Sequence, residues 1–173
     1  VSKVAASGCE TFLVHARKAW LKGLSPKQNR EIPELNYDRV YQLKRDFPEL
    51  EIIINGGVTT LEQSQAHLQQ IDGVMIGREA YTNPYLLASV DQQFYGSNEA
   101  IKSREKIAEQ FLQYVDNELC KGTKLQAMTR HILGLFHGMP GARQYRRHIS
   151  ENAYKPDATI DVLTTALAKT TGL

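Results

Sequence analysis

Short apolar runs of the sequence end in residues that are suited to binding an anionic ligand. These residues are His15, Asn55, Gly56, Gly57, Gly77 and Arg78. Glycine lets the backbone come close to a ligand, and an arginine presents a planar fork of donors to a phosphate. An imidazole adds a group that contacts a ring system. Together they predict a site for an electron-poor ring that carries a phosphate tail.

Each segment also has an interpretation without a ligand. Asn55-Gly56-Gly57 is typical of a tight turn between a strand and a helix. Arg78 could form a surface ion pair with Glu79 or Asp72, and His15 could be a structural histidine. The ligand interpretation is favoured because consecutive parallel strands present their carboxyl ends at one edge of a sheet.

Apolar runs alternate with helical patterns in the first half of the chain. We expect strands at 11–15, 52–54 and 74–76 and helices at 37–46 and 61–69. This order predicts an α/β fold with parallel βα units. Three strands alone would leave open sheet edges, so we expect residues 1–95 to be the C-terminal part of a TIM (β/α)8 barrel. The chain begins inside a helical pattern, which favours a fragment of a longer protein.

No strand pattern follows residue 98. Apolar periodicity predicts helices at 101–119, 125–136, 142–151 and 160–168. We expect residues 99–173 to form a small all-helical bundle domain.

The composition is that of a globular protein, with 42% hydrophobic and 23% charged residues. It excludes a disordered chain, and no apolar run is long enough for a spanning helix. The two cysteines, Cys9 and Cys120, stand in no metal or redox spacing, and we expect both to be buried free thiols. His131 and His137 have no ligand partners at metal-site spacing, so we expect no metal.

Basic residues cluster although the net charge is only +2. Two stretches, 11–30 and 119–150, contain lysines and arginines but no acidic residue. Such stretches favour a localised anionic partner, although chance clustering on solvated faces gives the same pattern.

Four segments in order resemble the tRNA-dihydrouridine synthases, and the last resembles bacterial subfamily A. They are Val14-His15-Ala16-Arg17-Lys18-Ala19-Trp20, Ile54-Asn55-Gly56-Gly57, residues 73–80 and residues 133–143. The resemblance implies an FMN-dependent TIM barrel followed by a helical domain that binds tRNA. It also implies NADPH-driven reduction of D-loop uridine to 5,6-dihydrouridine by a cytoplasmic, monomeric enzyme.

The same resemblance assigns roles to individual residues. The residues implied to hold FMN are His15, Asn55, Gly56, Gly57, Gly77 and Arg78. Those implied to contact tRNA are Lys27, Arg30, Arg143 and Arg146.

The chain departs from the family pattern in one respect. The proton-donating cysteine of the family lies in an Asn-x-Gly-Cys-Pro motif, which these 173 residues lack, and the flavin-contacting lysine is also absent. We therefore expect the catalytic cysteine upstream and an inactive isolated fragment. The alternatives are another FMN-dependent barrel oxidoreductase acting on a small molecule, and a non-catalytic RNA-binding fragment.

Overall fold

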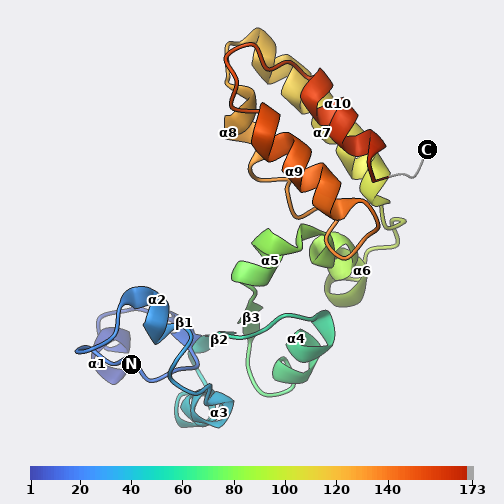
Figure 1. Ribbon diagram of the computed structural model, residues 1–173. Helices are drawn as coiled ribbons and strands as arrows, with labels where there is room; N and C mark the ends of the chain where they lie inside the picture. Colours follow the sequence, from blue (N-terminus) through green and yellow to red (C-terminus); the bar gives the residue numbers. More distant parts are fainter. Residues whose placement is uncertain (171–173) are drawn as a thin grey trace. The chain divides into compact units, whose positions relative to one another are not determined.

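Three parallel strands organise the first part of the chain (Figure 1). In the computed structural model, which describes residues 1–170, strand β2 (Glu51–Asn55) lies between β1 (Thr11–His15) and β3 (Gly73–Met75). The register pairs His15 with Asn55 and Asn55 with Met75. The predicted parallel α/β arrangement is confirmed, with strand bounds within one residue of those expected.

The two faces of this sheet differ in how they are covered. Ile52 and Ile54 of β2 are fully buried on the face that packs against helix α3 (Tyr37–Asp46). Side chains alternate between the faces of a strand, and on the opposite face Leu13 is 59% exposed. An apolar face left open in this way agrees with part of a barrel, whose closure stays a prediction.

Polar side chains fix the helix starts of this unit. Asn36 accepts a hydrogen bond from the Arg39 amide at the start of α3. Thr60 and Gln63 form a capping box at the start of α4 (Leu61–His67), which ends two residues earlier than expected. The remaining helices are α1 (Ser2–Ala5) and α2 (Pro26–Asn29).

The described part of the second unit, residues 79–170, consists of helices and turns. In chain order the elements after β3 are α5 (Arg78–Thr82), the 3-10 helix η1 (Pro84–Ser89), α6 (Val90–Tyr95), α7 (Arg104–Cys120), α8 (Leu125–Thr129), α9 (Ala142–Asn152) and α10 (Asp161–Ala168). Helices α9 and α10 lie side by side and pack with α7 around the fully buried Tyr145 and Val115 (Figure 1). That this unit is an independent domain stays a prediction.

The division between the two units falls between Arg78 and Glu79, earlier than the boundary near residue 95 expected from the sequence. Tyr85 packs on the core of the second unit, and the Arg104 guanidinium carbon lies 3.9 Å from the centre of its ring. The Tyr85 hydroxyl also donates to the Lys102 carbonyl. These contacts join the segment that precedes residue 95 to the helices.

The helix expected over 125–136 is wrong in its second half. Helix α8 ends at Thr129, whose hydroxyl donates to the Leu125 carbonyl one turn earlier. The amides of His131 and Ile132 then bond to carbonyls three residues back, which is the pattern of tight turns. A Cβ on Gly134 would lie 2.3 Å from the Thr82 carbonyl oxygen, so close packing replaces the helix here.

Candidate functional site

The carboxyl edge of the sheet brings His15, Asn55 and Met75 into one row. The Asn55 side-chain nitrogen lies 3.2 Å from the Met75 sulfur. On its other side the Asn55 side chain forms a hydrogen bond with His15. The structure therefore joins His15 and Asn55, as the strand order predicts, and adds Met75, which the sequence did not single out.

The surroundings of His15 are cationic. Burial lowers the pKa of its imidazole, and the charges of Arg17, Arg30 and Arg78 lower it further, while the hydrogen bond with Asn55 opposes them. Three guanidinium groups therefore act on one ring, which stays neutral at pH 7. Arg30 and Arg78, from distant parts of the sequence, thus belong to the same electrostatic environment, one suited to an anion.

The glycine pair after β2 is built into a packed turn. Gly56 and Gly57 have φ of 120° and 73°, values that favour glycine. A Cβ on Gly57 would lie 2.5 Å from a methyl carbon of Leu35, and one on Gly56 would lie 3.1 Å from the His15 ring. The Tyr37 hydroxyl donates to the Gly56 carbonyl at 2.9 Å. The turn itself therefore requires both glycines.

The start of α4 offers fewer donors to an anion than the sequence suggests. The Gln63 side-chain oxygen accepts from the amides of Thr59 and Thr60, and the Thr60 hydroxyl accepts from the Gln63 amide. These amides are already used within the protein. In the turn before them Gly57 is exposed, and its amide donates to no residue of the described chain. The Gly57 N–H is therefore an exposed donor that this turn presents.

Gly77 differs from the first pair. A Cβ at this position would meet no atom within 4 Å, and its φ is not positive. Neither the backbone conformation nor the packing of the described residues requires glycine here. The open space beside it is where a ligand could approach the backbone.

Arg78 forms an ion pair that the sequence did not suggest. Its Nη1 lies 3.2 Å from a carboxylate oxygen of Glu31, and both side chains are largely exposed. The expected partner Asp72 instead binds Lys44, at 2.8 Å. An exposed pair of this kind contributes little to stability, so a bound phosphate can compete for the guanidinium.

Arg17 anchors the loop that carries Lys27 and Arg30. Its Nη1 donates to the carbonyls of Glu31 and Pro33. Its buried Nε has no acceptor among the described residues. Lys27 lies in α2 and Arg30 caps that helix, and both are exposed. The loop thus presents two cations near the edge of the sheet.

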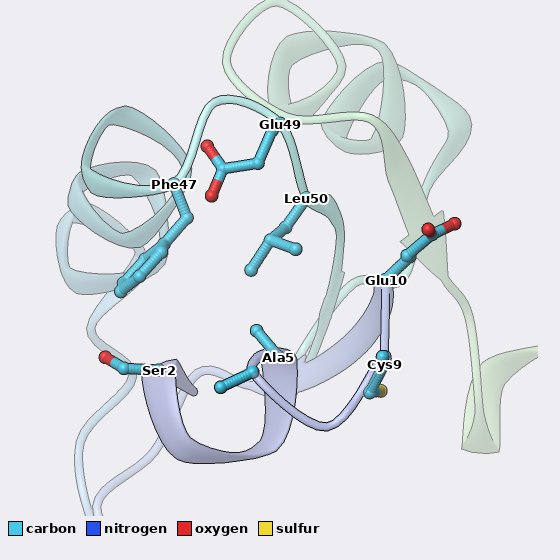
Figure 2. A pocket seen from close by; sticks show the side chains of 9 residues that line it. Ser2, Ala5, Cys9, Glu10, Phe47, Glu49 and Leu50 are labelled. Carbon is cyan, nitrogen blue, oxygen red and sulfur yellow. The ribbon is translucent and has the colours of Figure 1, made fainter.

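Two cavities lie at opposite edges of the sheet. One of about 410 Å³ adjoins His15, and its lining includes apolar residues and Arg17, Lys18 and Arg39 but no acidic residue. The other, of about 490 Å³, lies at the amino edge, where Ala5 faces Leu50 and the Glu49 carboxylate (Figure 2). Its acidic lining does not suit a phosphate, which favours the His15 edge.

Helix α9 presents Arg143 and Arg146 on its exposed side. Between them Tyr145 is fully buried, and its hydroxyl donates to the Ile132 carbonyl. Burial raises the pKa of the Tyr145 phenol. Because Tyr145 anchors the inner side of the helix, the two arginines are held outward, one turn apart.

The two cysteines belong to different units and differ in exposure. Cys9 precedes β1 at its amino end and is half-buried. Cys120 ends α7 and is exposed, so the expectation that it is buried is wrong. In the described residues no group of three or more His, Cys, Asp or Glu side chains could hold a metal ion. No helix in residues 1–170 is long and apolar enough to cross a membrane.

Comparison with known proteins gives a consistent result. The family model described as dihydrouridine synthase (Dus) matches residues 1–171. Proteins named tRNA-dihydrouridine(20/20a) synthase are 62% identical in Vibrio cholerae over 94% of this chain and 56% identical in Escherichia coli K12 over 96%. The chain spans about half the length of these relatives, 50% and 49% respectively. The chain belongs to the dihydrouridine synthase family.

Proposed function

We propose that the complete protein containing these residues is a tRNA-dihydrouridine synthase, which reduces D-loop uridine to 5,6-dihydrouridine with FMN and NADPH. The family match over residues 1–171 supports the reaction class. The observation that carries the proposal is the cationic carboxyl edge, where Arg17, Lys18 and Arg39 line the cavity beside His15 and the charges of Arg17, Arg30 and Arg78 lower the pKa of its imidazole.

The residues at this edge fit the phosphate of FMN. Within residues 1–170 the exposed Gly57 amide has no acceptor, the space beside Gly77 is open, and the buried Nε of Arg17 lacks an acceptor. Arg78 supplies a guanidinium that forms an exposed ion pair with the Glu31 carboxylate. We assign the phosphate to two segments, Asn55-Gly56-Gly57 and Gly77-Arg78, and contact with the flavin to His15. Hydride transfer is the chemistry that this cofactor supplies when it is bound.

Contacts with tRNA are proposed for both units. Lys27 and Arg30 are exposed in the loop held by Arg17, and Arg143 and Arg146 are exposed on α9. Guanidinium groups suit RNA because they bond to phosphate and stack on bases. Neither Cys9 nor Cys120 matches the family's proton donor. The role we propose for the 173 residues is therefore binding of tRNA and FMN, not proton transfer. We propose that the complete enzyme acts in the cytoplasm as a monomer.

Replacement of Arg78 tests the cofactor assignment. The Arg78→Ala variant of the complete protein should bind FMN about tenfold more weakly or worse, because a charge-assisted pair with phosphate is lost. The measurement is flavin absorbance per protein after purification, followed by an FMN titration. Arg45→Ala is the matched control, since Arg45 is an exposed arginine that bonds to Gln42 within α3. Equal flavin content in both variants would contradict the phosphate assignment.

A further inference from the structure

A cluster of aromatic side chains lies behind the Gly56-Gly57 turn. The edge of the buried His67 ring meets the ring of Tyr37, with centroids 4.5 Å apart at 65°. The Nδ1 atom of His67 shares a hydrogen bond of 2.7 Å with the Tyr41 hydroxyl. Tyr37 and Tyr41 are one helical turn apart on α3, and His67 ends α4. The contact with His67 therefore packs the Tyr37 ring of α3 against α4.

Tyr37 connects this cluster to the turn through its hydroxyl. That hydroxyl donates to the Gly56 carbonyl at 2.9 Å, and a Cβ on Gly57 would lie only 3.0 Å from it. The Gly56 carbonyl and the Gly57 N–H belong to one trans peptide unit. In such a planar unit these two groups point in opposite directions. When Tyr37 fixes the carbonyl inward, it aims the Gly57 N–H outward.

The burial of the turn agrees with this orientation. Gly56 is buried, whereas Gly57 is exposed and its amide has no acceptor among the described residues. We infer that Tyr37 is a positioning residue, whose hydroxyl orients the Gly57 N–H as a donor to the phosphate of FMN. This inference rests on the proposed function and extends it, because it names the donating atom and the side chain that directs it.

Replacement of Tyr37 by phenylalanine removes only the hydroxyl. The ring can keep its packing on His67, while the Gly56 carbonyl loses its donor and the peptide unit can rotate. A hydrogen bond to a charged phosphate is among the stronger ones in proteins, so we expect about tenfold weaker FMN binding by Tyr37→Phe. Binding of riboflavin, which lacks the phosphate, should not change. A general loss of structure would weaken both flavins alike.

Tyr41→Phe is the matched control. It removes a hydroxyl from the same helix and the same cluster, but Tyr41 bonds to His67 and not to the turn. We expect its melting temperature to fall at least as far as that of Tyr37→Phe. Its ratio of FMN to riboflavin affinity should equal that of the wild type.

A second measurement needs no variant. Gly56-Gly57 is the only Gly-Gly pair in these 173 residues, so glycine labelled with ¹³C at the carbonyl and ¹⁵N at the amide in this segment alone, ligated to an unlabelled remainder, marks this peptide unit. In the wild-type complete protein, FMN should move the Gly57 amide proton signal downfield of its position with riboflavin. An identical position with both flavins would overturn the inference.

The outcomes separate the inference from the proposed function. If the wild-type protein binds FMN no more tightly than riboflavin, the phosphate site and the inference both fail. If the wild type prefers FMN and Tyr37→Phe keeps the full preference, only the role of Tyr37 fails. A preference lost in Tyr37→Phe and kept in Tyr41→Phe supports the positioning role.

Discussion

Gly57 and Gly77 are glycines for different physical reasons, although each closely follows a strand. Gly57 has a φ of 73° and is packed against Leu35, whereas a Cβ on Gly77 would meet no described atom within 4 Å. The conformation and packing of the turn require glycine at position 57. At position 77 the described residues leave the space beside the glycine empty. A Cβ is therefore expected to destabilise the fold at Gly57, whereas at Gly77 it would only occupy the open space.

Alanine should therefore lower the stability at position 57 but not at position 77. Gly57→Ala should lower the free energy of unfolding by about 1–3 kcal/mol, because of the strained φ and the contact with Leu35. Gly77→Ala should change it by less than about 0.5 kcal/mol and still weaken FMN binding. Denaturant unfolding and flavin titration of the complete protein provide the two measurements. Full FMN affinity in Gly77→Ala would argue that the open space is not a ligand site.

The candidate residues themselves could be found from the sequence, but their partners could not. His15, Asn55 and Arg78 stand out because they follow apolar runs. Nothing local indicates that Glu31 would pair with Arg78 or that Tyr37 would bond to the Gly56 carbonyl. These contacts join residues that lie 47 and 19 positions apart. They depend on how the loop and α3 fold back onto the sheet.

At the scale of elements, sequence patterns predict helices well where a cap and an apolar face agree. Helix α3 spans the predicted residues because Asn36 caps it and its apolar side packs on the sheet. Helix α8 stops early because tertiary packing at Gly134 overrides the apolar periodicity. Strand β2 also includes Glu51 and Asn55, because both pair with residues of β1. Helix α7 starts late, at Arg104, because the Ser103 side chain caps it.

The packing of α3 on α4 should depend on pH through His67. Burial lowers the pKa of His67 below 6.5 in the folded protein, so the unfolded chain binds the proton first as the pH falls. Stability is thus complete above about pH 6.5 and decreases below it, toward the folded-state pKa. His15, whose pKa is also lowered, contributes with the same sign.

We expect the loss of unfolding free energy between about pH 7.5 and about pH 5.5 to be smaller in His67→Gln than in the wild type. Glutamine has no proton to gain in this range, although the variant should be less stable at both pH values. Denaturant unfolding at each pH measures the difference. An equal loss in both proteins would show that His67 does not titrate differently on folding.

At the scale of the whole molecule, the net charge is small although each of the two units carries a basic region. The loop with Lys27 and Arg30 lies in residues 1–78, and α9 with Arg143 and Arg146 lies in residues 79–173. Arg147 on the same helix is instead paired with Glu151, at 2.7 Å. The burial of Tyr145 explains why Arg143 and Arg146 are available to a partner.

Single alanine variants of α9 test this surface. Arg146→Ala should weaken tRNA binding by the complete protein and reduce its salt dependence by about one unit of slope, as expected when one phosphate contact is lost. Arg147→Ala removes the same charge from the same helix and should have the smaller effect. Electrophoretic mobility shifts at several salt concentrations provide the measurement. Equal slopes in Arg146→Ala and the wild type would exclude Arg146 as a phosphate contact.

The most direct test of the account is dihydrouridine formation by the complete protein. Unmodified tRNA transcript is incubated with the protein, FMN and NADPH, and its nucleosides are analysed by mass spectrometry. We predict a D-loop uridine that gains two hydrogen atoms in the wild type, a strongly reduced yield in Arg78→Ala, and no product from the 173 residues alone. A flavin-loaded wild-type protein that leaves every uridine unchanged would contradict the proposed function.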